Sequence, residues 1–99
     1  MTLHARAEVP TDRPERWVKQ LVSHLGRRLE GSVDETTGVG RLDGPGMSVT
    51  LEPVGPTLVL EASAEDAEGL DRITDVVGSH LQRFAASTEE LAVRWIPAP

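Results

Sequence analysis

The sequence predicts an α+β fold in which two helices cover one face of a mostly antiparallel, five-stranded sheet. Apolar residues recur with a helical period in two stretches and alternate with polar residues in five others. Each predicted helix has one apolar stripe and each predicted strand has one apolar face, so the two layers bury these surfaces against each other. The expected order is β-α-β-β-β-α-β, in a single domain over residues 1–99.

The first predicted strand is Leu3–Val9, where apolar residues alternate with His4, Arg6 and Glu8. A helix is expected to follow, because Pro14 suits a first helical turn and Thr11 or Asp12 can cap the free amides before it.

We expect this first helix to run to about Leu29, with Gly31 as its stop signal. Residues spaced by three and four positions form its apolar arc. They are Trp17, Val18, Leu21, Val22, Leu25 and Leu29.

Three short strands are predicted next, because glycine and proline divide residues 31–61 into brief alternating stretches. They are placed at Val39–Leu42, Met47–Pro53 and Thr57–Ala62. Hairpin turns are expected at Asp43-Gly44 and at Gly55-Pro56.

The second helix is expected to begin after Ser63, which can act as its N-cap, and to end before Ser87-Thr88. Its apolar band consists of Leu70, Ile73, Val77, Leu81 and Phe84. The period then changes to two, which predicts a closing strand over Leu91–Ile96 with Leu91, Val93 and Trp95 on its inner face. Because proline cannot donate to a ladder, we expect the tail 97–99 not to extend the sheet.

Composition excludes several classes of protein. The chain has no cysteine, so disulfides and thiolate metal sites are ruled out. It carries a net charge of −6, and its densest basic residues lie on the predicted solvated face of the first helix, so we expect no nucleic-acid partner. No apolar run is long enough to span a membrane or to serve as a signal peptide, which makes a cytoplasmic protein the expectation.

Two separated motifs resemble the DUF2218 proteins, a small uncharacterised family from bacteria. The first is the run Thr11–Leu21 followed by His24, and the second is Val77–Ala85 followed by Glu90–Trp95. Relatives of this kind are stand-alone domains or modules attached to siderophore-interacting flavin reductases. The resemblance therefore implies a link with iron acquisition, but it implies no reaction.

His24 and His80 are the first candidate site residues. Each lies at the edge of the apolar stripe of its helix, so both can point into the seam if the helices pack side by side. Neutral imidazoles in that seam would suit a transition metal or a haem iron. The alternative is that each histidine is bonded to a backbone carbonyl or a carboxylate. The sequence requires no cofactor and leaves the metal unknown.

Arg16, Lys19, Gln20 and Arg83 are further candidates for ligand binding, as a charged rim for an anion such as a catecholate or carboxylate siderophore. Trp17 could stack on such a ligand. The alternatives are surface ion pairs for the charged residues and a core position for the tryptophan, with its indole N–H bonded to a nearby acceptor.

No catalytic apparatus is visible. The pairs Asp34-Glu35 and Glu89-Glu90 are neighbours whose side chains are expected to diverge, and no Gly-x-Ser-x-Gly motif is present. The leading interpretation is a non-catalytic binding or accessory domain linked to iron or siderophore use, with a siderophore-like ligand or a siderophore-interacting flavin reductase as partner. The alternatives are a structural interaction module that self-associates through its open sheet face or an edge strand, and a small metal- or haem-dependent enzyme using His24 and His80. The protein is expected to be a monomer or a homodimer.

Overall fold

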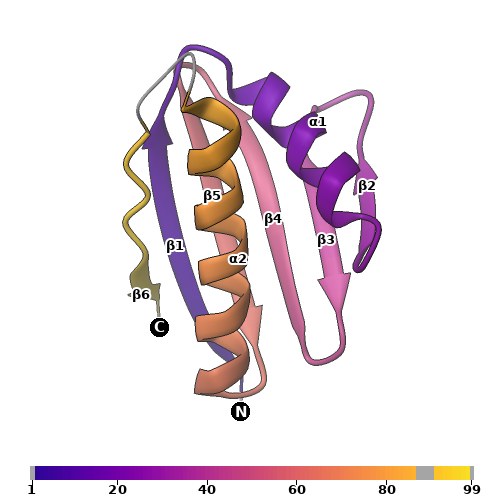
Figure 1. Ribbon diagram of the computed structural model, residues 1–99, viewed down its shortest axis with the longest axis vertical. Helices are drawn as coiled ribbons and strands as arrows, with labels where there is room; N and C mark the ends of the chain where they lie inside the picture. Colours follow the sequence, from indigo (N-terminus) through magenta and orange to yellow (C-terminus); the bar gives the residue numbers. More distant parts are fainter. Residues whose placement is uncertain (1, 87–90, 99) are drawn as a thin grey trace.

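The computed structural model describes residues 2–86 and 91–98. Two helices lie side by side on one face of an antiparallel sheet, as the sequence predicts, but the sheet has six strands rather than five (Figure 1). The strand order is β2-β3-β4-β5-β1-β6. The elements are β1 (Leu3–Pro10), α1 (Pro14–Leu25), β2 (Glu30–Val33), β3 (Gly40–Gly44), β4 (Met47–Val54), β5 (Thr57–Ala64), α2 (Ala67–Ala85) and β6 (Ile96–Ala98).

Three long strands form the centre of the sheet. β5 pairs with β4 on one side and with β1 on the other, over eight residues each. In one row across these strands Leu51 faces Leu60, which faces Ala7, and all three side chains are buried. The small residue in β1 leaves room above the sheet for α2, which contacts β1, β4 and β5. α1 contacts β2, β3, β4 and β5.

The core lies between the helices and this face of the sheet. From α1 it takes Trp17, Val18, Leu21, Val22 and Leu25, and from α2 it takes Ile73, Val77, Leu81 and Ala85. The predicted helical stripes are therefore confirmed, although Leu70 and Phe84 are only partly buried against the core. In the described ranges, neither helix is long and apolar enough to cross a membrane.

The first helix is shorter than predicted. It ends at Leu25 rather than near Leu29, and Gly26 forms the C-cap through its N–H, which donates to the carbonyl of Val22. A glycine costs about 1 kcal/mol in a helix interior, so Gly26 is the earlier stop signal. Gly31, the predicted stop, instead lies in β2. The cap prediction is also wrong, because the N-cap residue is Arg13 and its side chain forms no cap hydrogen bond.

One prediction about the second helix also needs correction. Ser63 is not its N-cap: β5 continues to Ala64, and the Ser63 hydroxyl lies 2.8 Å from the hydroxyl of Ser48 on β4. The helix is capped instead by Asp66, whose side chain accepts a hydrogen bond of 2.7 Å from the N–H of Gly69. The helix ends at Ala85, with Ala86 as its C-cap, and therefore before Ser87-Thr88 as predicted; residues 87 and 88 themselves lie outside the described residues.

A sixth strand, β2, was missed. It pairs with β3 at the edge of the sheet, and three of its four residues are exposed. Its sequence therefore lacks the alternation of apolar residues that would reveal a strand.

The closing strand is displaced from its predicted position. Residues 91–95 are not in a strand, although Leu91 is buried and Val93 and Trp95 are partly buried against the core as predicted. Val93 and Trp95 lie beside Gly78 of α2. The chain pairs with β1 only from Ile96, so the prediction that the tail does not extend the sheet is wrong. Pro97 is tolerated there because β6 is an edge strand, where a missing N–H can face solvent.

The turns between the middle strands match the predictions in part. Gly55-Pro56 connects β4 to β5 as expected, with Gly55 at a φ of 55°. The turn between β3 and β4 is formed by Pro45-Gly46 rather than Asp43-Gly44, since Gly46 supplies the positive φ, 70°, that a turn of this residue order requires.

The face of the sheet away from the helices is polar and partly paired. Arg6 reaches Glu61 at 3.2 Å and Glu8 at 3.6 Å. Arg41 donates to Asp43 at 2.8 Å, and this carboxylate raises the pKa of the Arg41 guanidinium through the hydrogen bond and the charge attraction. Such exposed pairs contribute little stability, so the fold depends on the apolar face.

Truncating the centre of α2 should destabilise the protein. The Leu81 side chain is fully buried, and we expect Leu81→Ala to lower the free energy of unfolding by about 2–5 kcal/mol. Urea unfolding followed by circular dichroism measures this change. Asp75→Ala, at an exposed position of the same helix, is the control and should change it by less than about 0.5 kcal/mol. A cost below about 1 kcal/mol for Leu81→Ala would contradict the packing described.

Adding one methyl group at Gly40 should also destabilise the fold. A Cβ at this position would lie 2.7 Å from Val18 Cγ1 and 2.9 Å from Val22 Cγ2 of α1. We expect Gly40→Ala to cost about 1–3 kcal/mol, because α1 must move away from the sheet.

The matched control for Gly40→Ala is Gly78→Ala in α2. There the nearest atom, Trp95 Nε1, is at 3.4 Å, an ordinary contact, and alanine is favoured over glycine in a helix by about 1 kcal/mol. The two substitutions should therefore shift the urea midpoint in opposite directions, and equal shifts would disprove the close approach at Gly40.

Candidate functional site

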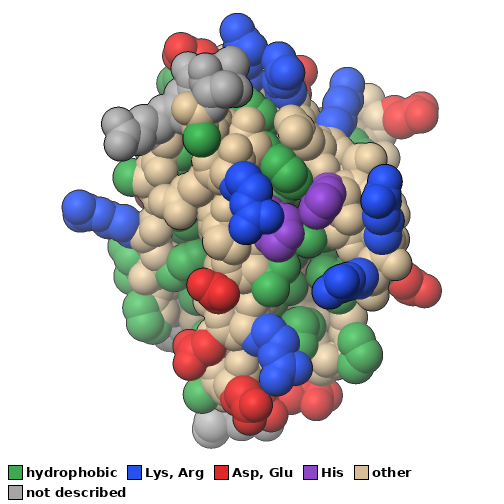
Figure 2. All heavy atoms as spheres, in the orientation of Figure 1, with side chains coloured by type: hydrophobic (Ala, Val, Ile, Leu, Met, Phe, Trp, Pro, Cys, Tyr) green, Lys and Arg blue, Asp and Glu red, His purple; other side chains and the backbone are tan. Residues whose placement is uncertain are grey.

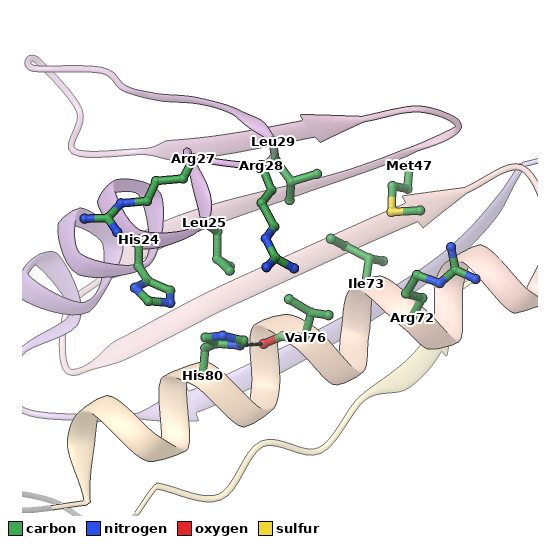
Figure 3. A pocket seen from close by; sticks show the side chains of 10 residues that line it. All are labelled: His24, Leu25, Arg27, Arg28, Leu29, Met47, Arg72, Ile73, Val76 and His80. Atoms are coloured by element: carbon green, nitrogen blue, oxygen red, sulfur yellow. Dashed lines mark hydrogen bonds between the residues drawn. The ribbon is translucent and has the colours of Figure 1, made fainter.

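A groove of about 400 Å³ lies between the end of α1, the turn that follows it, the middle of α2 and the start of β4 (Figure 3). It is large enough for a small organic ligand. Its walls combine apolar, cationic and imidazole side chains. They are His24, Leu25, Arg27, Arg28, Leu29, Met47, Arg72, Ile73, Val76 and His80.

The early end of α1 creates this groove. After Gly26 the chain turns tightly, with the N–H groups of Arg28 and Leu29 donating to the carbonyl of Leu25 at 3.0 and 2.9 Å. The turn places Arg27 and Arg28 in the lining of the groove and directs the Leu29 side chain against the core. Had the helix continued, these residues would have followed the helical spiral around α1.

The floor of the groove is apolar. Leu25 and Ile73 belong to the buried core, while Leu29, Met47 and Val76 are packed against it and partly exposed. Met47 adds a flexible thioether, which adapts readily to the shape of a ligand. The part of a ligand that lies on the floor of the groove therefore contacts an apolar surface.

The rim is cationic, although the whole chain has a net charge of −6. Arg27, Arg28 and Arg72 are three of its ten basic residues, and none of the ten lining residues is acidic. Figure 2 shows Lys and Arg side chains on this face around the two histidines. Arg72 pairs with Glu68 at 3.4 Å, an exposed contact, whereas Arg27 and Arg28 form no ion pair with any other described residue. Two uncompensated guanidinium groups favour an anionic ligand.

The two predicted histidines converge at one end of the groove. The ring centres of His24, from α1, and His80, from α2, are 5.1 Å apart, and the ring planes are tilted by 43° (Figure 3). Phe84 lies edge-on to His24, with ring centres 5.1 Å apart, and its ring centre lies 6.0 Å from that of His80. The sequence allowed both histidines to point into the seam if the helices packed side by side, and the structure brings the two rings together there.

A hydrogen bond determines which nitrogen of His80 carries the proton. Nδ1 lies 2.7 Å from the carbonyl oxygen of Val76, which can only accept, so Nδ1 donates. In the neutral ring Nε2 then has a free lone pair. The carbonyl bond that the sequence offered as an alternative is therefore present, and it leaves the other nitrogen available.

The structure places Trp17 outside the groove. Its side chain is in the core, and its Nε1–H donates at 2.8 Å to the hydroxyl of Thr11, as the alternative interpretation expected. Arg16 lies with its guanidinium 5.6 Å from the centre of the Trp17 ring, so it covers the indole rather than the groove.

The other rim candidates are also absent from the groove lining. Lys19 lines a separate hollow whose lining also includes the acidic residues Glu15, Asp34 and Glu35. Gln20 is partly buried and Arg83 is exposed, and neither lines the groove. Glu89-Glu90, rejected as an acid pair on sequence grounds, lies outside the described residues.

The residues that sequence reasoning missed are Arg27, Arg28, Arg72 and Met47. The first two were assigned to the solvated face of a longer helix. Gly26 directly before them is the signal that could have revealed a turn. In the described part of the chain no three His, Asp or Glu side chains lie close enough to hold one metal ion, so the histidine pair has no third protein ligand there.

Comparison with known proteins places the chain in a family. The model of the family described as "Uncharacterized protein conserved in bacteria (DUF2218)" matches residues 6–96. No curated protein matches the chain. The NMR structure of PA4090 from Pseudomonas aeruginosa is similar, with 28% sequence identity, a TM-score of 0.77 and 97% of each chain covered. The chain therefore belongs to the DUF2218 family, as its two motifs indicated.

Proposed function

We propose that this protein is a non-catalytic binding domain whose groove takes a small organic anion with an apolar or aromatic body. The observation that carries the proposal is the placement of Arg27 and Arg28, uncompensated by any described acid, above an apolar floor. An anion gains charge-assisted hydrogen bonds from the guanidinium groups while its body covers Leu29, Met47 and Val76.

Aromatic carboxylates and catecholates have this combination of charge and ring. The iron link suggested by the family resemblance supports the same ligand class, since catecholate and carboxylate siderophores contain such groups. We therefore propose a cytoplasmic role in siderophore or iron handling, with a siderophore-interacting flavin reductase as the candidate partner.

Self-association through the open sheet face remains the second candidate. It has weaker support, because that face pairs its own polar groups, such as Arg6 with Glu61 and Ser48 with Ser63. Sedimentation over a concentration series tests it: a monomer at every concentration would exclude a homodimer.

Ligand binding is tested with salicylate, an aromatic carboxylate, and with salicylamide, its neutral counterpart. Calorimetry and NMR titration should show binding of salicylate with shifts centred on the groove, and much weaker binding of salicylamide. Replacing Arg27 and Arg28 together by glutamine should weaken salicylate binding about 10- to 100-fold, because hydrogen bonds between charged groups are worth about 1.5–3 kcal/mol.

The matched control is Arg94→Gln, which removes one exposed positive charge outside the groove. It should leave the affinity for salicylate within about twofold, since distant exposed charges are screened at physiological salt. Equal binding of salicylate and salicylamide, or unchanged binding in the double arginine variant, would contradict the proposal.

A further inference from the structure

We infer that His24 and His80 together hold a divalent transition metal ion such as Zn²⁺ at the end of the groove, with coordination positions left open for an oxygen-donor anion. The histidine part of this inference stands on its own. The anion part rests on the proposed function.

The spacing of the rings fits one shared ion. Zn–N bonds are about 2.0–2.1 Å long and the geometry is tetrahedral, which places the centres of two coordinating imidazoles about 5 Å apart. The observed separation is 5.1 Å. The tilt of 43° also shows that one ring is not stacked flat on the other. His24 is exposed and His80 partly exposed, so an ion can reach both rings.

The surroundings of the two rings also suit a metal ligand. Metal-binding histidines usually donate their second ring N–H to a carbonyl or carboxylate, which fixes the tautomer and the ring orientation. His80 does so through Nδ1 and the Val76 carbonyl, at 2.7 Å, and its Nε2 is left for an ion. The Phe84 ring lies edge-on to both imidazoles, with ring centres 5.1 Å from His24 and 6.0 Å from His80. The hydrogen bond to Val76 therefore orients the His80 ring before any ion arrives.

Charge explains why the site needs an anion. Arg27, Arg28 and Arg72 line the same groove and repel a bare cation. No third His, Asp or Glu of the described chain joins the pair, so at least two positions of a tetrahedral ion stay open. An anionic oxygen donor can fill them while its remaining charge is matched by the arginines. The groove thus suits a metal ion together with an organic anion better than either one alone.

The test uses the full chain, Zn²⁺ for calorimetry and paramagnetic Co²⁺ for NMR. We expect Zn²⁺ to bind at one site and Co²⁺ to broaden the resonances of His24, His80 and Phe84 selectively. His24→Gln and His80→Gln should each weaken Zn²⁺ binding at least tenfold, with dispersed NMR spectra showing that both variants fold. His4→Gln is the matched control, because His4 is the third histidine of the chain and lies on β1, away from the groove; it should bind Zn²⁺ like the parent.

Several results would overturn the inference. These are no Zn²⁺ binding at millimolar concentration, broadening centred on His4, and unchanged affinity in both histidine variants. Salicylate should tighten Zn²⁺ binding at least threefold, and Zn²⁺ should tighten salicylate binding by the same factor.

The two proposals fail separately. If the protein binds salicylate through Arg27 and Arg28 but does not bind Zn²⁺, the metal site is overturned and the proposed function is supported. If the protein binds Zn²⁺ through the two histidines but does not bind salicylate, the metal site is supported and the proposed function is overturned.

Discussion

The close approach of α1 to the sheet at Gly40 is the constraint on which the site depends. Val18 and Val22 occupy the space that a Cβ at Gly40 would need. α1 therefore packs closely against β3, and it also contacts α2 on the same face of the sheet. If a side chain at Gly40 pushed α1 away from the sheet, the separation of His24 on α1 from His80 on α2 would change. The geometry of a surface site is thus determined by a contact inside the core.

The end of α1 is the second determinant, because it decides what lies beside α2. Gly26 stops the helix, and the turn after it carries Arg27, Arg28 and Leu29 to the groove. One glycine therefore gives the site both its uncompensated charge and part of its apolar floor. The histidine pair is positioned differently, by facing turns of two helices. Cationic and imidazole groups meet in the groove because a loop and a helix–helix seam lie next to each other.

The layers and the apolar stripes could be predicted, since each follows from the period of apolar residues and from economical packing. The sequence allowed His24 and His80 to meet in the seam but did not decide whether they do; their closeness is seen in the structure. The edge strand, the helix caps and the arginines of the groove could not be predicted, because the spacing of apolar residues carries no information about them. β2 is an exposed edge strand, so its residues carry no alternation. Ser63 and Asp66 are both good caps, and only the length of β5 decides between them. Arg27 and Arg28 were assigned to a solvated face because the first helix was extended past Gly26. A single residue can decide where a helix ends, and placing the end of the first helix too late also misplaced two residues of the groove.

Charge distribution narrows the kind of anion that the groove can select. The chain carries sixteen acidic and ten basic residues, so at a distance it repels anions, and a long polyanion such as nucleic acid gains no continuous basic surface. Attraction becomes favourable only close to Arg27 and Arg28, within about 8–10 Å at physiological salt. A ligand must therefore be small enough to meet this local charge without approaching the acidic remainder, and it must bury apolar surface on Leu29, Met47 and Val76 to gain affinity. These two requirements together favour a compact organic anion over a highly charged one.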